Sequence, residues 1–187
     1  GGVTAYAFTE YPGDGTFAAG GIRYEHQTSH KYQVRRFNSD GKYVFSKEIT
    51  VLATDAQQPP YGLLQGLANG QLYIVGNAQP IDKNQPVAAW VAVLDAGGKM
   101  LRDGMYPTPG KGQFYGMTPL SNGDAMLVGY GTSASGQAYP RLTRLGPTGK
   151  LLFDSKPNAQ PLSYRGILAL PGGDLLITGN KTDVSAS

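Results

Sequence analysis

The stretch Leu120-Ser-Asn-Gly-Asp-Ala-Met-Leu-Val-Gly129 joins a tight-turn signal to a short apolar run, and it decides the fold because it recurs. Asn-Gly supplies the backbone angles that a hairpin turn needs, and a short apolar run bounded by such turns is typical of a strand. Similar phrases surround Gly15, Gly70 and Gly173, which together with Gly123 are spaced 55, 53 and 50 residues apart. A period of this length indicates a repeat architecture.

A second tight turn alternates with the first. Its glycines are Gly41, Gly98 and Gly149, spaced 57 and 51 residues apart, and a lysine and an apolar pair follow each of them. One repeat is therefore four strands joined by two tight turns and a variable polar loop, which is typical of a β-propeller blade. We predict an all-β fold, a β-propeller of four-stranded antiparallel blades that occupies residues 1–187 as a single domain. About three and a half repeats are present, with blades at 3–51, 61–107, 114–157 and 163–187, the last of them incomplete.

The phrase Leu94-Asp-Ala-Gly-Gly-Lys-Met-Leu101 resembles the repeat of bacterial extracytoplasmic β-propellers of the quinoprotein-like and delta-60 types. The resemblance covers nearly the whole chain and concerns the repeat architecture. Phe45, Arg102 and Phe153 stand where that family often has Trp, so a quinone cofactor is not implied. The resemblance implies a periplasmic or secreted propeller that acts as a binding platform. We expect that any signal peptide has been removed, because the first residues do not form one.

Closure of the ring has three interpretations, because propellers usually contain about four to eight blades. The chain is a piece of a longer propeller, or a four-bladed ring with a degenerate last blade, or one of two partial rings that close against each other. Open blade edges expose unpaired backbone and invite self-association.

Composition excludes several classes of protein. The 187 residues include 27 Gly and 13 Pro, too many for a helix bundle, and no Cys, so disulfides and thiol chemistry are absent. The net charge is +3, and the basic residues are spread along the chain, so we expect no nucleic-acid partner. No apolar run approaches the ~18 residues of a membrane span.

A tyrosine recurs near the start of the first strand of each blade. The residues in question are Tyr6, Tyr61, Tyr115 and Tyr164, with Arg165 beside the last. The first strand of a blade is its innermost strand, so these side chains would surround the mouth of the channel. Rigid amphipathic rings and a guanidinium suit a sugar or a peptide. The alternative is that the tyrosines pack between blades as part of the core.

Residue patterns for catalysis are missing. The only histidines, His26 and His30, fall in a predicted loop, and most aspartates sit in or beside turns, where turn chemistry explains them. We therefore expect no catalytic residue, metal or cofactor. We predict a non-enzymatic binding module that recognises a protein or glycan partner through its loops and channel mouth. The alternative is a polysaccharide-active lyase or hydrolase that uses Tyr and Arg at the same mouth.

Overall fold

The computed structural model describes residues 3–13, 15–24, 30–51, 63–78, 86–106, 109–157 and 162–181. Within them the chain forms strands and no helix, so the predicted all-β class is confirmed. The strands are, in order, β1 (Val3–Glu10), β2 (Phe17–Tyr24), β3 (His30–Phe37), β4 (Tyr43–Val51), β5 (Leu63–Gly66), β6 (Leu72–Ala78), β7 (Ala88–Leu94), β8 (Met100–Tyr106), β9 (Gly112–Pro119), β10 (Ala125–Thr132), β11 (Ala138–Leu145), β12 (Leu151–Ser155), β13 (Leu162–Ala169) and β14 (Leu175–Lys181).

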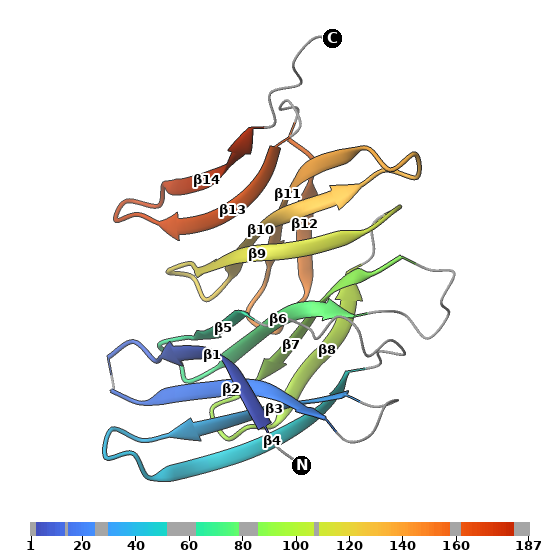
Figure 1. The fold of residues 1–187 in the computed structure, drawn as a ribbon. Coiled ribbons are helices and arrows are strands. Elements are labelled where there is room, and N and C mark those ends of the chain that lie inside the picture. The colour runs from blue at the N-terminus through green and yellow to red at the C-terminus, as the bar shows by residue number, and fades with distance from the viewer. Residues whose placement is uncertain are drawn as a thin grey trace.

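The strands form sheets in which each strand pairs antiparallel with its neighbours in the chain (Figure 1). The first sheet is β1–β4, the second is β5–β8 and the third is β9–β12, each with four strands in chain order. The last sheet contains β13 and β14. The predicted four-stranded antiparallel sheets are therefore confirmed, and no sheet closes on itself in the part of the chain that the structure describes.

Each tight turn between paired strands contains at least one glycine with a left-handed backbone. At the β9–β10 turn, Gly123 has a φ of 85° and donates its N–H to the carbonyl of Leu120 at 3.0 Å. The N–H of Leu120 in turn donates to the carbonyl of Asp124 at 2.8 Å. Residues with a Cβ rarely adopt this angle, so the recurrent glycines fix where each pair of strands ends.

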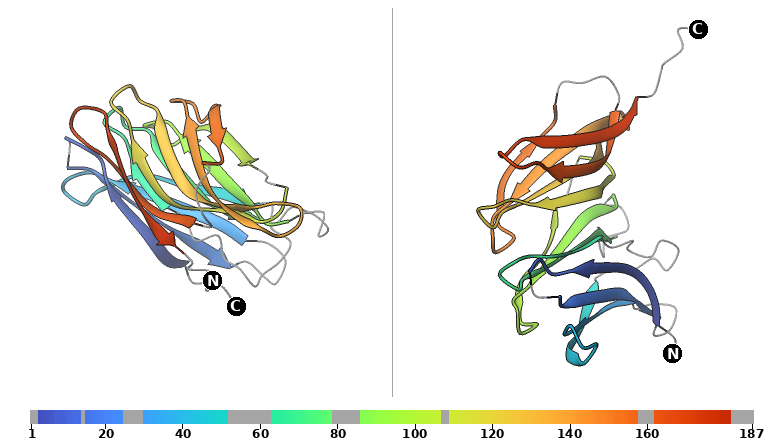
Figure 2. Two further views of the ribbon diagram at one scale, coloured as in Figure 1. Left: turned by 90° about the horizontal axis from the view of Figure 1, so that it is seen from above. Right: turned by 90° about the vertical axis from the view of Figure 1, so that its left-hand side faces the viewer.

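The second sheet lies between the first and the third (Figure 2). Every residue of β7 is buried, as expected of a strand that is covered on both faces, whereas its outer neighbour β8 is largely exposed. One core cluster joins the first and second sheets through residues such as Tyr32, Trp90 and Leu94. A separate cluster joins the second and third sheets and includes Val91 and Leu127. The core is thus divided into layers between sheets.

The first strands of successive sheets contact one another: β1 contacts β5, β5 contacts β9, and β9 contacts β13. Hydrogen bonds from tyrosine hydroxyls of the second sheet to a turn of the third sheet also hold these two sheets together. The hydroxyl of Tyr73 in β6 donates to the carbonyl of Gly146 at 2.6 Å, and the hydroxyl of Tyr106 in β8 donates to the carbonyl of Gly149 at 2.6 Å. Both carbonyls belong to the β11–β12 turn, so the second sheet holds that turn of the third.

No helix among the described residues has the length and apolar character needed to cross a membrane.

Candidate functional site

Two tyrosines and one arginine form a partly exposed stack on the third and last sheets. The rings of Tyr115 in β9 and Tyr130 in β10 lie 5.7 Å apart with an angle of 18° between their planes. The guanidinium of Arg165 in β13 lies over the ring of Tyr115, 4.1 Å from its centroid. Both rings are half-buried and Arg165 is exposed. We call these three residues the Tyr-Arg stack.

Irregular strand pairing places two members of the stack. Tyr115 is the extra residue where the β9–β10 register shifts, and Arg165 is the extra residue where the β13–β14 register shifts. Such a bulge leaves one residue unpaired and redirects its side chain. Glycines follow both positions, and a Cβ on Gly116 would lie 3.0 Å from the Cα of Gly166. The two strands therefore approach closely enough for Arg165 to reach Tyr115.

The electrostatics of the stack favour a protonated phenol. Burial raises the pKa of Tyr130, the neighbouring Tyr115 acts in the same direction, and the charge of Arg165 opposes them. At neutral pH Tyr130 is therefore a hydrogen-bond donor and not a base. Arg165 makes no hydrogen bond or ion pair with any other described residue, so its N–H groups can face an acceptor on a ligand.

The structure unites two of the five residues singled out from the sequence. Tyr115 and Arg165 are in contact, whereas Tyr164 stands opposite Gly179 and takes no part in the Tyr-Arg stack. Tyr6 lies in β1, but its side chain is outside the described part of the chain, as is all of Tyr61.

Strand register also corrects the expected equivalence of Tyr164 with Tyr115, which rested on the recurrence of tyrosine. Phe114 stands opposite Gly129 just as Tyr164 stands opposite Gly179, so Tyr164 corresponds to the buried Phe114 and Arg165 corresponds to Tyr115. Tyr130 was missed because it does not recur in the repeat.

A concave feature away from the Tyr-Arg stack lies where three hairpin turns converge. The turns β1–β2, β5–β6 and β9–β10 surround a cavity of about 340 Å³ at the end of β9 that is remote from its start. Its lining residues are Pro12, Leu67, Ala68, Asn69, Pro119, Leu120, Ser121 and Gly123. None of these side chains is charged, so the cavity offers apolar contact and no acid or base.

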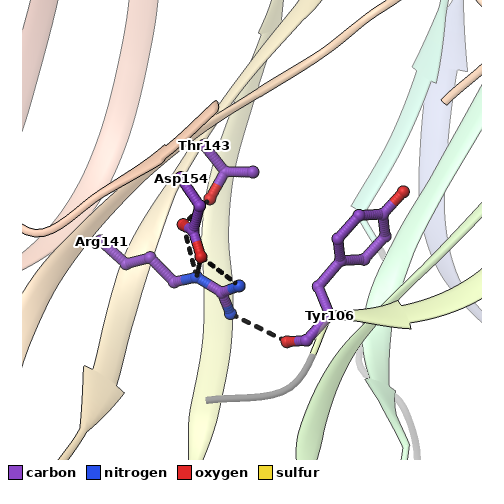
Figure 3. A network of polar contacts seen from close by, with 4 residues as sticks. All are labelled: Tyr106, Arg141, Thr143 and Asp154. Carbon is purple, nitrogen blue, oxygen red and sulfur yellow. Dashed lines mark hydrogen bonds and ion pairs between the residues drawn. The ribbon is translucent and has the colours of Figure 1, made fainter. Parts of the chain in front are cut away.

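An ion pair in the third sheet joins a buried arginine to a partly exposed aspartate (Figure 3). Arg141 in β11 is 2% exposed and binds Asp154 in β12 through its Nε and Nη2 atoms, at 2.9 and 2.8 Å. Its Nη1 donates to the backbone carbonyl of Tyr106 at 3.1 Å, and the hydroxyl of Thr143 donates to Asp154 at 2.7 Å. The guanidinium is committed to these partners on two sheets, so the network joins the second sheet to the third and is structural.

No protein-family model and no curated protein matches this chain, so the resemblance to a propeller repeat family stays a prediction.

Proposed function

We propose that this chain is a non-enzymatic, propeller-type binding module that recognises a protein or glycan partner through loops and the mouth formed by its first strands. The succession of four-stranded antiparallel sheets in chain order, with their first strands in contact, supports the propeller. We place the module outside the cytoplasm on the strength of the repeat resemblance.

One observation carries the binding proposal: the Tyr-Arg stack brings together two nearly parallel, half-buried aromatic rings and an exposed guanidinium that makes no hydrogen bond or ion pair with other described residues. Aromatic rings offer flat apolar contact at low entropic cost, and a guanidinium binds carboxylates with two parallel hydrogen bonds. The stack therefore fits a flat sugar or peptide surface that carries an acidic group.

The test is a binding screen followed by variants of the stack. Neutral and uronate-containing oligosaccharides, and peptides with and without acidic residues, are presented to the purified chain. We expect binding to the acidic members only. Arg165→Gln should then weaken the affinity about tenfold, which corresponds to about 1.4 kcal/mol, and should reduce its salt dependence.

The matched control is Arg35→Gln, because Arg35 is an exposed arginine in β3, on the first sheet and away from the stack. It should bind like the wild type, and both variants should keep the wild-type melting temperature. Unchanged binding by Arg165→Gln, or an equal loss in both variants, contradicts the proposal.

The enzymatic alternative has a separate readout. A lyase that used tyrosine as its base would need a phenol pKa lowered toward neutral, whereas the pKa of Tyr130 is raised. We expect no shortened product after prolonged incubation with any bound oligosaccharide. If the wild type releases a shortened product and Tyr130→Phe does not, the chain is an enzyme and the proposal of a non-enzymatic module is wrong.

A further inference from the structure

The outer face of the first sheet carries an aromatic stripe, with one ring from each of its four strands. Phe8 and Phe17 have ring centroids 5.5 Å apart, Phe17 and Phe37 stack at 5.0 Å, and Phe37 and Tyr43 meet edge to face at 6.1 Å. Phe8 is 66% exposed and Tyr43 is 56% exposed. An aromatic row with this exposure is unusual on a free surface.

The equivalent positions of the second sheet show what kind of contact the positions of the aromatic stripe make when another sheet covers them. Phe17 and Leu72 are each the first residue of the second strand of their sheet, and Phe37 and Leu94 each end the third strand. Leu72 and Leu94 are fully buried in the cluster between the second sheet and the first. The aromatic stripe therefore occupies the positions that, one sheet later, pack against the preceding sheet.

The last sheet presents the opposite face. Leu168 and Leu176 stand directly opposite each other on β13 and β14 and are 55% and 52% exposed. Ala18, Tyr73 and Met126 hold the position of Leu176 in the earlier sheets, and all three are buried. We call Leu168 and Leu176 the leucine pair.

A polar contact marks the same face in the earlier sheets. The hydroxyl of Thr9 accepts the N–H of Gly66 from the second sheet at 3.1 Å. Likewise, the hydroxyl of Thr118 accepts the N–H of Ala169 from the last sheet at 3.1 Å. Thr118 stands opposite Met126 just as Leu168 stands opposite Leu176, so the leucine pair lies on the face that elsewhere receives the next sheet.

The two exposed faces are thus the two halves of the contact that the sheets repeat along the chain. They lie on the first and last sheets, at opposite ends of the stack (Figure 1). Arrays of stacked units need polar outer faces to stay apart, and here both outer faces carry large apolar side chains.

We propose that copies of this chain associate head to tail, with the leucine pair of one copy packed on the aromatic stripe of the next. The occupant of each face is a second copy, because the register of the repeat matches these two faces to each other. A contact between two different surfaces generates a ring where the rotation closes and a filament where it does not. This proposal is independent of the binding proposal, since neither face includes the Tyr-Arg stack.

The experiment uses two variants that each block one face. Leu168→Glu/Leu176→Glu places charges on the leucine pair, and Phe8→Glu/Tyr43→Glu places charges on the aromatic stripe. All four side chains are exposed in the single chain, so both variants should fold, which circular dichroism and thermal melting check. Sedimentation equilibrium between about 1 and 200 µM then gives the mass.

We expect the wild-type mass to rise with concentration in multiples of the 19.8 kDa chain. Each variant alone should stay a monomer. An equal mixture of the two should form a dimer and nothing larger, because each member keeps one intact face and the two intact faces are complementary. The control Leu152→Glu changes an exposed leucine of β12, outside both faces, and should associate like the wild type.

Three results would overturn the proposal. A wild-type chain that stays at the monomer mass throughout the range has no such contact. A variant that dimerises alone uses one face twice, which is a symmetric contact. A mixture that stays monomeric, or a loss of association in Leu152→Glu, means that these two faces do not meet.

Discussion

The second sheet and the last sheet contain nearly the same strand in different surroundings. β6 begins Leu72-Tyr-Ile-Val and β14 begins Leu175-Leu-Ile-Thr. All four residues are buried in the second sheet, whereas Leu176 and Thr178 are exposed in the last. An apolar strand therefore follows from the local sequence, but the free energy gained from its burial depends on whether a neighbouring sheet covers it.

The largest expected difference follows from truncating one leucine in each of these strands. Leu72→Ala should lower the free energy of unfolding by about 4 kcal/mol, because it leaves a cavity in the core between the first two sheets. Leu176→Ala should cost less than about 1 kcal/mol in dilute solution, where half of its surface already meets water. Urea unfolding at low micromolar protein measures both values. Equal losses would mean that the last sheet is covered in the free monomer.

Equivalent aspartates in the second and third sheets allow a second comparison. Asp154 neutralises the buried Arg141, whereas Asp103 accepts a hydrogen bond from the indole N–H of Trp90. Asp154→Ala should cost about 3 kcal/mol, because it strands a buried charge. Asp103→Ala should lower the free energy of unfolding by about 1 kcal/mol, because it removes only the acceptor of the neutral indole N–H of Trp90.

The double variant Arg141→Met/Asp154→Leu serves as the control for the ion pair. It removes both charges and should recover most of the stability that Asp154→Ala loses. Equal costs for the two single variants, or a double variant as unstable as Asp154→Ala, would show that the buried charge is not the cause. Denaturant midpoints of the four proteins decide the matter.

The sequence predicted what repeats and missed what occurs once. Turn glycines recur every 50 to 57 residues, so the strands and their antiparallel pairing could be inferred from spacing. Tyr130 and the pair of Arg141 with Asp154 have no counterpart of the same chemistry in other repeats, and only the three-dimensional register brings them to their partners. Tyr164 was matched with Tyr115 by residue type, whereas Tyr115 and Arg165 each lie eight residues before their turn glycine and each form the bulge of their strand pair.

The glycines of equivalent turns in the first and second sheets also differ in their surroundings. Gly41 and Gly98 occupy equivalent turns with φ angles of 75° and 84°, so Ala at either position is strained by about 1 kcal/mol or more. A Cβ on Gly41 meets nothing within 4 Å, whereas a Cβ on Gly98 would lie 2.8 Å from the ring of Phe45 in the first sheet. Gly98→Ala should therefore cost about 2 kcal/mol and Gly41→Ala about 1 kcal/mol.

The combination of Gly98→Ala with Phe45→Leu checks the cause of that difference. A smaller side chain at position 45 removes the ring that the new methyl group would meet. The double variant should therefore lose less stability than the sum of the two single changes. Strict additivity in thermal unfolding would mean that the first sheet does not press on this turn.

The smallest expected effect concerns one hydroxyl at the contact between the second and third sheets. Tyr73→Phe removes the donor to the carbonyl of Gly146 and should cost about 1 kcal/mol at pH 7, whereas Tyr43→Phe, at an exposed ring, should cost nothing measurable. Burial raises the pKa of Tyr73 to about 12. The unfolded chain therefore loses this proton first, near its ordinary pKa of about 10, so stability is retained below pH 10 and falls as the pH rises toward 12.

Tyr73→Phe should accordingly show a shallower loss of stability than the wild type between pH 9 and pH 11.5, as measured by urea unfolding at each pH. Tyr73→Phe should still lose some stability over this pH range, because burial also raises the pKa values of Tyr32 and Tyr130. Identical slopes in the wild type and in Tyr73→Phe would mean that water reaches Tyr73 between the two sheets. The contact between the second and third sheets would then admit water at Tyr73, although this side chain is fully buried in the structure.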